Sequence, residues 1–595
     1  MRGRMVAGEK PAKGVFKKSM IKLLKYCKKY YWLIGIALFL GVIAVVCQII
    51  TPNLISDLTE LISGAIKNGV QIDLHSVTTT ALTILILALI SALLGYFQHF
   101  IMATATQKIV FKFRKDIAGK INRLPLKYFD THLYGDTLSR ITNDVDTIGQ
   151  SLNQSVASLF SNIILFIGVV IAMFVTQWIM AFTVIVATLL GLSIMLIFLT
   201  KSQKYFNMQQ KSLADMNAHI EEVYSGHNVV KLFNAEKEKG GEFNAINKKL
   251  YSSAWKSQFL SGAMMPIMNF VGNFAFVAVC VVGAVLVSTG MIGLGPIAAF
   301  MIYARMFANP LSQIAQSLTS LQSTSAASNR VFEFLEEEEL ENESKKTKVL
   351  TNVKGDIEFD HVKFGYNKDR IIIHDFSVKV KAGQKVAIVG PTGAGKTTLV
   401  NLLMRFYEIN SGDIKIDGVS TKDLTRENIH DLFGMVLQDT WLFQGTIKEN
   451  LRYNKDHVTD GEIVDACKSV GVDHFIQTLP QRYDTVIDDS VNLSAGQKQL
   501  LTIARTMIAN NPMLILDEAT SSVDTRTEEL IQKAMDKLME GRTSFIIAHR
   551  LSTIKNADII LVLKDGDVIE KGNHEELMAK GGFYADLYNS QFAES

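Results

Sequence analysis

The sequence predicts a multi-domain protein, with an all-α, six-helix transmembrane domain followed by an α/β domain. Two observations predict this division. Long uncharged apolar runs lie almost entirely before about residue 325, and after residue 355 short β-rich runs alternate with helical patterns around a glycine-rich loop. The chain has 595 residues, 48% of them hydrophobic, which is too long for a single hydrophobic core.

Six apolar spans are expected to cross a membrane as helices. They are residues 31–50, 80–102, 155–176, 178–200, 260–287 and 291–318. Each holds about twenty apolar-rich residues, enough for a hydrocarbon core of about 30 Å. No Asp, Glu, Lys or Arg occurs over 147–200 or 257–304, so we divide the first run at Gln177 and the second at Gly290 and residues 293–296.

The charges around these spans predict their orientation. The first thirty residues hold ten Lys or Arg against one acid, and residues 15–30 form a basic amphipathic pattern suited to the headgroup layer. The segments 104–150 and 201–256 are basic, whereas the loop after the first span is acidic. The positive-inside rule therefore places both long segments and both termini in the cytoplasm of a multi-pass protein.

Composition argues against nucleic acid as a partner and indicates one domain boundary. A net charge of only +3 indicates no attraction to nucleic acid, and the four scattered cysteines lack metal-ligand spacing, so reduced thiols are expected. Seven glutamates between 333 and 343 predict a solvated linker. The expected segments are 1–30 (basic tail and interfacial helix), 31–330 (membrane domain), 331–354 (linker) and 355–595 (α/β domain).

A glycine-rich loop organises the second domain. An apolar run, 385–389, precedes it and a helical pattern follows, which is the context of a phosphate-binding P-loop. Lys396 would reach the β- and γ-phosphates and Thr397 would hold Mg²⁺. The residues expected to bind the nucleotide here are Gly390, Pro391, Thr392, Gly393, Ala394, Gly395, Lys396, Thr397 and Thr398.

Two further apolar runs end in polar side chains. Residues 513–516 lead into Asp517 and Glu518, where Asp517 would bind Mg²⁺ directly or through water and Glu518 would act as general base. Residues 545–548 lead into His549, which would bond the γ-phosphate or order the attacking water.

Leu493-Ser494-Ala495-Gly496-Gln497, read with the P-loop, the Asp-Glu pair and the histidine, resembles the signature of ATP-binding-cassette (ABC) proteins. The resemblance extends to Tyr366 as an adenine-stacking aromatic, to Gln438 and to Asp524. The membrane half is similar to that of ABC exporters of type IV, so nearly the whole chain is covered.

The resemblance implies that two cassettes bind ATP and Mg²⁺ between the P-loop of one and the signature of the other. Ser494, Gly496, Gln497 and Asp524 would then contact the nucleotide, and Gln438 would be both a metal ligand and a catalytic residue. With one P-loop and one signature, the chain needs a second half-transporter. Residues 131–136 and 225–230 match the short coupling helices of the family, with Gly135 and Gly226 as turn or close-approach positions.

The second half is expected to be a different chain. Glu518 and His549 are intact, but Ala495 stands where the family usually has Gly. The half of heterodimeric bacterial multidrug exporters that keeps the catalytic Glu often has such an altered signature, so a heterodimer in a bacterial cell membrane is favoured. A homodimer that tolerates the alanine is the alternative.

The expected activity is ATP-driven export of amphipathic or hydrophobic compounds, drugs included. Met-rich and aromatic residues near the helix breaks suit varied apolar ligands. Arg305 lies well inside the sixth span, where a charge should face protein or water rather than lipid. A lipid or lipid-precursor flippase is the main alternative, a siderophore-type importer stays open, and a channel gated by ATP is disfavoured by Glu518.

Overall fold

The structure is a computed structural model, and it describes residues 15–367, 370–438, 440–488, 493–517, 524–547 and 551–592. The chain forms two compact units. The first comprises Met1–Asn122 and Tyr134–Glu337, and the second comprises Arg123–Leu133 and Glu338–Ser595. The division at residue 337 falls inside the acidic segment, and a short stretch of the N-terminal half belongs to the second unit.

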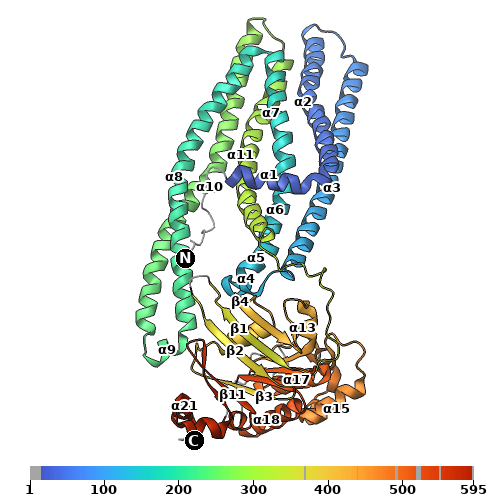
Figure 1. Cartoon of the computed structure of the whole chain (residues 1–595). Helices are drawn as coiled ribbons and strands as arrows, with labels where there is room; N and C mark the ends of the chain where they lie inside the picture. The colour runs from blue at the N-terminus through green and yellow to red at the C-terminus, as the bar shows by residue number, and fades with distance from the viewer. Residues whose placement is uncertain are drawn as a thin grey trace. The chain divides into compact units, whose positions relative to one another are not determined.

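The first unit is entirely helical (Figure 1). Its long helices are α2 (Tyr31–Lys67), α3 (Leu74–Ile121), α7 (Ala157–Thr176), α8 (Trp178–Ser225), α10 (Glu236–Ser288) and α11 (Gly295–Leu335). Its shorter ones are α1 (Val15–Cys27), η1 (Lys28–Tyr30), α5 (Tyr134–Ser139), η2 (Arg140–Asp144), α6 (Val145–Ser151), η3 (Leu152–Val156) and α9 (His227–Leu232). The expected breaks are confirmed, because α7 and α8 meet at the extended Gln177, and six residues separate the end of α10 at Ser288 from Gly295.

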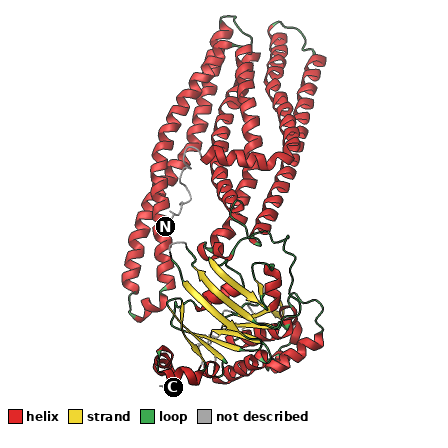
Figure 2. Cartoon of the chain, in the orientation of Figure 1, coloured by secondary structure: helices red, strands yellow, loops and turns green. Residues whose placement is uncertain are grey.

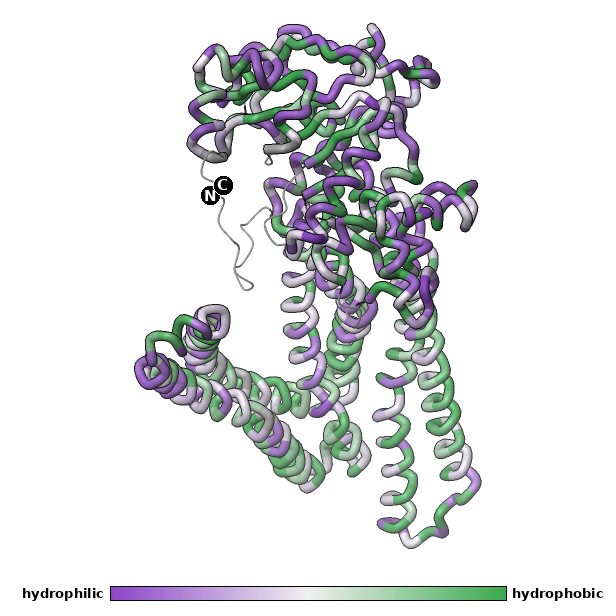
Figure 3. Tube along the Cα trace, turned by 90° about the horizontal axis from the view of Figure 1, so that it is seen from below, coloured by the Kyte–Doolittle hydropathy of each residue, from purple (hydrophilic) through white to green (hydrophobic). Residues whose placement is uncertain are grey.

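Five helical stretches among the described residues are long and apolar enough to cross a membrane. They are Phe16–Lys67, Leu74–Ile121, Tyr134–Thr176, Trp178–Ser225 and Glu236–Ser288. Hydrophobic positions recur along the long helices in Figure 3. The sixth helix, α11, is long enough but more polar, because Arg305 and several Asn, Gln and Ser residues interrupt its apolar positions.

Packing places α11 in the same bundle. Phe300, Tyr303 and Phe307 of α11 are buried in one cluster with residues of α7, α8 and α10. The amide oxygen of Asn53 on α2 accepts hydrogen bonds from the hydroxyls of Thr176 and Tyr303, both at 3.0 Å. One polar side chain thus joins three helices, which satisfies groups that lipid could not.

Helix α1 lies across the long helices of its own unit (Figure 1). Leu23 and Cys27 are buried against the bundle, and Lys22 forms an ion pair with Glu336 at 2.6 Å. Leu24 and the neighbouring lysines face outward. The helix predicted over 15–30 is confirmed, and its two faces explain why apolar and basic residues alternate there.

The second unit is α/β (Figure 2). Six strands form the main sheet in the order β12-β11-β3-β10-β9-β6, parallel except for β12. These strands are β3 (Lys385–Val389), β6 (Phe433–Val436), β9 (Met513–Asp517), β10 (Thr543–Ile547), β11 (Ile559–Lys564) and β12 (Asp567–Gly572). An antiparallel sheet holds β1 (Ile357–Phe364), β2 (Ile373–Val380), β4 (Ser411–Ile416) and β5 (Val419–Ser420), and β7 (Gly445–Thr446) pairs with β8 (Val486–Ile487).

The alternation of side chains along the parallel strands separates two cores. In β9, Leu514 and Leu516 pack with the helices on one face, whereas Met513 and Ile515 pack toward the antiparallel sheet. Strands buried on both faces read as continuous apolar runs, which is the pattern seen in the sequence. The α/β fold class is confirmed.

Helices cover this sheet and its edges. They are α4 (Leu126–Thr131), α12 (Lys396–Leu403), α13 (Arg426–Leu432), α14 (Ile447–Arg452), α15 (Asp460–Val470), α16 (Asp473–Thr478), η4 (Arg482–Asp484), α17 (Ala495–Ala509), α18 (Thr525–Met539), α19 (Leu551–Lys555), α20 (His574–Lys580) and α21 (Phe583–Phe592). Three of them begin at predicted motifs, with Gly395 before α12, Ser494 before α17 and Asp524 before α18.

Most glutamates of the acidic segment are exposed, as a solvated linker predicts, but the segment is also attached to the second unit by ion pairs. Glu343 is only 12% exposed and forms ion pairs with Lys346, Arg405 and Arg426 at 2.9–3.0 Å. Glu339 pairs with Arg123 at 2.8 Å. The glutamates therefore attach the segment to the second unit, a pairing that a charge count along the chain could not reveal.

Candidate nucleotide-binding site

The P-loop connects β3 to α12 as predicted. Gly390, Gly393 and Gly395 have φ of 157°, 84° and 99°, and the last two lie in the left-handed region that favours glycine. A Cβ on Gly390 would approach the carbonyl oxygen of Leu563 to 2.3 Å, whereas Gly393 has open space beside it. Glycines at these positions let the backbone turn tightly at the start of a helix, where N–H groups can bind a phosphate chain.

Lys396 closes this loop from its helix. Its ammonium donates to the carbonyl oxygens of Gly390 and Pro391 at 2.7 and 3.1 Å. Burial lowers the pKa of Lys396, and the negative charge of Asp517 acts in the opposite direction. The cation and the strand-end carboxylate therefore lie close enough to interact electrostatically.

Strand pairing explains why motifs far apart in sequence meet. In the order β3-β10-β9-β6, Ile388 pairs with Ile547, Ile547 with Asp517, and Leu516 with Val436. All four strands are parallel, so their carboxyl ends share one edge of the sheet. The P-loop, Asp517 and the segment with Gln438 follow directly from that edge, where open α/β sheets bind ligands.

Some predicted residues lie outside the described part of the chain. These are Glu518 and His549, the two residues predicted to be catalytic. They follow β9 and β10 in the sequence, so their strands lead to the correct edge. Gln438 is described and exposed two residues after β6, and Thr397 is exposed on α12.

Tyr366 packs beside the P-loop helix. Its hydroxyl lies 3.2 Å from the hydroxyl of Thr398, and its ring is nearly perpendicular to that of Tyr407, with centroids 4.9 Å apart. Its position two residues after β1 is consistent with an aromatic at the nucleotide site, and the contact with Thr398 connects two residues predicted separately.

The signature forms the start of α17. The hydroxyl of Ser494 accepts from the N–H of Gln497 at 3.2 Å, and the Gln497 side chain accepts from the N–H of Ser494 at 2.9 Å. These two bonds form a reciprocal capping box. Among the described residues, the side chains of Ser494 and Gln497 bond to each other's backbone. Ala495 is the first residue of the helix and is exposed, so its methyl group faces outward from this chain, whereas Gly496 is buried.

Asp524 caps the next helix. Its carboxylate accepts from the N–H of Thr527 at 3.0 Å at the start of α18, and this bond lowers the pKa of Asp524. The family resemblance predicted a role at the nucleotide for Asp524, and the structure adds a local role that any N-cap aspartate could fill.

The two coupling stretches need correction in detail. The first, residues 131–136, is the turn between α4 and α5, and the short helix is α4, at Leu126–Thr131. The second is a short helix as predicted, α9. Gly226 lies in the turn between α8 and α9, and a Cβ on it would lie 3.2 Å from the carbonyl oxygen of Glu222, so its turn position is confirmed. Gly135 is the second residue of α5 and has open space beside it, so the turn or close-approach role assigned to it is wrong.

Sequence reasoning missed Tyr407 and Asp130. The Tyr407 hydroxyl donates to the Asp130 carboxylate on α4, a contact between residues 277 positions apart. Neither residue stands in a recognisable motif, and only an aromatic-rich run, 406–407, hints at a buried role. The contact explains why α4 belongs to the second unit.

Comparisons with known proteins agree with this geometry. The family model described as ABC transporter transmembrane region matches residues 34–311, and the model described as ABC transporter matches residues 373–521. A fatty acid ABC transporter ATP-binding/permease protein of Mycobacterium bovis is 45% identical over 89% of this chain and 84% of its own length.

More distant relatives have other names. A Bacillus subtilis protein named probable multidrug resistance ABC transporter ATP-binding/permease protein is 36% identical over 85% of this chain and 75% of its own length. An ATP-dependent lipid A-core flippase of Syntrophus aciditrophicus is 33% identical over 93% and 92%.

The membrane bundle, the P-loop edge and the capped signature occur in one chain that these relatives match along most of its length. Such proteins couple ATP hydrolysis to transport across the membrane, and half-transporters of this kind act as dimers. The chain belongs to the ATP-binding-cassette transporter family, as an exporter half-transporter in which a multi-pass membrane domain precedes a nucleotide-binding domain.

Proposed function

We propose that this half-transporter exports amphipathic compounds, and that acyl-chain molecules with an anionic head group are among them. The observation that carries the proposal is a polar stripe on α11. Exposed side chains recur there at helical spacing, at Arg305, Asn309, Gln313 and Gln316. The opposite face of the same helix is buried at Phe300, Tyr303 and Phe307.

A polar stripe of this kind is costly against lipid. Charged and amide side chains within membrane-spanning segments face protein or a water-filled path. In a single chain the stripe is exposed, so a dimer would turn it toward the second half or toward a path between the halves. Apolar surface beside it and polar groups along it suit a ligand with both characters.

Arg305 gives the stripe its charge. Its guanidinium has no hydrogen bond or ion pair with any described residue, although it stands ten residues into α11. A carboxylate or phosphate head group would provide the missing partner through paired N–H donors. The name of the fatty acid relative supports an acyl-chain substrate, and the flippase and multidrug names fit the same amphipathic class.

The nucleotide-binding residues have distinct roles in the proposed cycle. The N–H groups of the P-loop and Lys396 hold the phosphates, Tyr366 stacks on the adenine, and Thr398 supports Tyr366. Thr397, Gln438 and Asp517 would hold Mg²⁺, which would neutralise phosphate charge when bound. Glu518 accepts the proton of the attacking water, and His549 orients that water at the γ-phosphate.

The second half completes each site. Ser494, Gly496 and the first N–H groups of α17 face the partner's ATP, with Gln497 fixing the hydroxyl of Ser494 and Asp524 fixing the start of α18 beside it. The exposed methyl of Ala495 stands between this surface and that nucleotide. Because the Ala495 methyl is exposed on its own chain, we expect it to weaken the partner's nucleotide site and not this chain's own site. This supports a heterodimer in which this chain supplies the hydrolysing P-loop.

The orientation follows from charge. The basic segments near 104–150 and 201–256, together with the exposed lysines of α1, belong on the cytoplasmic side, and both termini and the nucleotide-binding domain lie with them. Transport from that side to the outside is export.

Uptake into inside-out vesicles tests this function. Vesicles containing the chain and its partner should accumulate a fluorophore-labelled fatty acid with ATP, and Glu518→Gln should abolish uptake while trapping ATP. Lys396→Ala should lower the rate of ATP turnover about a hundredfold or more, because the variant lacks a phosphate ligand. Normal turnover in Lys396→Ala would refute the P-loop assignment.

Substitution of Arg305 tests the substrate class. Arg305→Gln should reduce uptake of the anionic probe about tenfold and leave a matched cationic amphiphile unaffected, whereas Arg305→Lys should be intermediate. Asn309→Ala on the same stripe is the matched control without a change of charge. Equal loss of both probes would assign Arg305 to assembly instead, and movement of lipid between leaflets without release would favour a flippase.

A further inference from the structure

We propose that Tyr407 is a positioning residue that connects helix α4 to the adenine-stacking Tyr366, so that nucleotide binding makes α4 more ordered. The inference rests on the proposed role of Tyr366 but not on the identity of the transported compound. All the residues involved belong to the second unit.

The first link is the bond between Tyr407 and Asp130. The Tyr407 hydroxyl donates to the carboxylate of Asp130, the fifth residue of the six-residue helix α4. Tyr407 is 8% exposed, and burial together with the negative Asp130 raises its pKa, so the phenol stays protonated and remains the donor. A neutral phenol held by a carboxylate is a strong, directional contact.

The second link is the ring of the same residue. Tyr407 lies at right angles to Tyr366 with centroids 4.9 Å apart, and Phe364 packs against both, with centroids 5.0 Å from Tyr366 and 5.7 Å from Tyr407. Edge-to-face aromatic pairs hold their geometry better than aliphatic contacts. On its other side Tyr366 reaches the hydroxyl of Thr398 on the P-loop helix.

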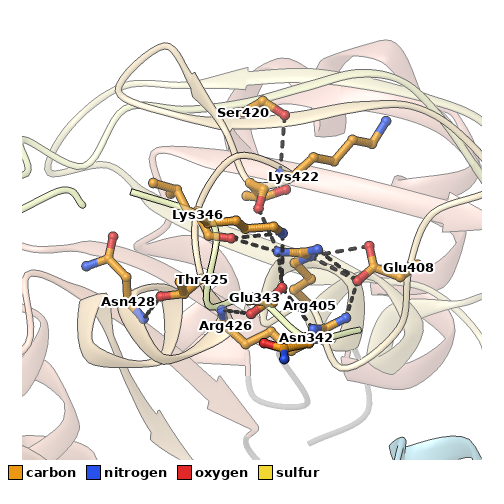
Figure 4. Close-up of polar contacts among 12 residues, drawn as sticks. Asn342, Glu343, Lys346, Arg405, Glu408, Ser420, Lys422, Thr425, Arg426 and Asn428 are labelled. Atoms are coloured by element: carbon orange, nitrogen blue, oxygen red, sulfur yellow. Dashed lines mark hydrogen bonds and ion pairs between the residues drawn. The ribbon is translucent and has the colours of Figure 1, made fainter. Parts of the chain in front are cut away.

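The third element is a rigid base for Tyr407. Two residues earlier in the chain, Arg405 has a positive φ of 53° and is 4% exposed. Its guanidinium donates to the carbonyl oxygens of Thr421 and Leu424. It also forms ion pairs with Glu343 and Glu408 (Figure 4). This network fixes the backbone on which Tyr407 stands, so a movement of the Tyr366 ring would be transmitted rather than absorbed.

Space for such a movement exists beside the rings. A cavity of about 310 Å³ adjoins them. Its lining residues come from the start of α4, from the acidic segment and from the nucleotide-binding domain. They include Pro125, Lys127, Leu340, Tyr366, Tyr407 and Asn410. Close-packed side chains could not turn, whereas rings at the edge of a cavity can.

These three features give a short path from nucleotide to α4. Stacking on adenine would fix the orientation of Tyr366, Tyr366 would fix the ring of Tyr407, and the Tyr407 hydroxyl would hold Asp130. Helix α4 follows α3 in the chain after only four residues, so order gained at α4 reaches the end of a membrane helix through the backbone.

Amide hydrogen exchange of residues 122–134 tests this path. The measurement uses the full dimeric transporter in nanodiscs with Glu518→Gln in this chain, with and without ATP. In that parent protein, ATP should slow exchange of α4 about fivefold or more, and Tyr407→Phe or Asp130→Ala should remove the difference. The double variant should lose no more than either single one, since both delete the same bond.

Two further variants separate positioning from a general structural role. Asp130→Asn keeps an oxygen that accepts from the tyrosine, so the ATP-dependent protection should persist. Tyr483→Phe is the matched control, because the Tyr483 hydroxyl donates to Asp473 at 2.6 Å in the same domain but away from α4. Protection that survives in Tyr407→Phe, or that disappears equally in Tyr483→Phe, would overturn the proposal.

Binding of a fluorescent ATP analogue distinguishes failure of this inference from failure of the proposed function. Tyr366→Ala should weaken binding about tenfold if that side chain stacks on adenine. Unchanged binding in Tyr366→Ala would reject the adenine role itself. Weaker binding in Tyr366→Ala combined with unchanged protection of α4 in Tyr407→Phe would reject only the connection through Tyr407.

Discussion

The two short helices α4 and α9 occupy equivalent places in the chain but differ in what surrounds them. Each interrupts the chain between two long helical stretches. Helix α4 is held by its own nucleotide domain through Asp130, whereas α9 exposes Val229, Leu232 and Phe233 by 58%, 75% and 73%.

This difference indicates which helix serves its own chain. Large apolar side chains that cluster at a polar tip are unfavourable in water and mark an interaction surface. Because half-transporters of this family act as dimers, we infer that α4 reports on the nucleotide domain of its own chain and that α9 docks on the partner.

The largest test of the comparison is to make α9 polar. Leu232→Ser with Phe233→Ser should lower transport at least about tenfold, because a docking surface loses two buried apolar anchors in the dimer. Uptake into vesicles measures transport, and cross-linking measures assembly. Tyr251→Ser is the control, since Tyr251 is similarly exposed at 70% but lies on α10; an equal loss in that variant would remove the distinction between the helices.

A second test removes the support on the α4 side. Arg405→Ala breaks ion pairs with Glu343 and Glu408 and removes the donor that the carbonyl oxygens of Thr421 and Leu424 share, which should cost about 3 kcal/mol. Thermal unfolding of the nucleotide domain within the purified transporter should show this as a lower transition temperature. Lys379→Ala, which breaks a more exposed pair with Glu358, should leave the transition close to its original value.

Acid should weaken the same attachment. Burial acts to raise the pKa of Glu343, but the N–H of Arg426 and the charges of Lys346, Arg426 and Arg405 outweigh it and hold the pKa below the ordinary 4.5. A lowered pKa stabilises the fold above about pH 4.5, and this contribution is lost as the pH falls through the folded-state pKa. Glu343→Gln should therefore lose less thermal stability between pH 7 and pH 4 than the parent protein, and an equal loss would contradict the attachment.

The smallest effect is expected at the entrance to α4. Arg123 and Glu339 form an ion pair at 2.8 Å, but their side chains are 59% and 36% exposed. Water and salt weaken such pairs, so Arg123→Ala should change stability by at most about 1 kcal/mol. A larger shift in the transition temperature would mean that the acidic segment is attached mainly there and not at Arg405.

The sequence predicted the parts of this molecule that depend on local pattern. Apolar runs located the membrane helices, and the glycines before Lys396 located the P-loop, because both follow from periodicity and from backbone conformations that few residues adopt. The helix break at Gln177 was visible for the same reason.

Contacts between distant residues were not predictable in this way. Nothing near Asp130 in the sequence indicates a tyrosine 277 residues later, and the charge of Glu343 suggested water rather than arginine. The role assigned to Gly135 by resemblance was wrong, because this residue lies inside α5 with open space beside it. Predictions failed where partners are set by tertiary packing.

The capping box at Ser494 has a consequence for which sequences can stand at that position. The serine oxygen uses a lone pair to accept from Gln497, which leaves the hydroxyl hydrogen for the phosphate proposed to bind there. Aspartate would start the helix equally well but would repel the phosphate, and alanine would provide neither interaction. In a saturation library at residue 494, fewer amino acids should support transport than helix capping alone or phosphate binding alone would allow. Threonine should be the closest acceptable replacement.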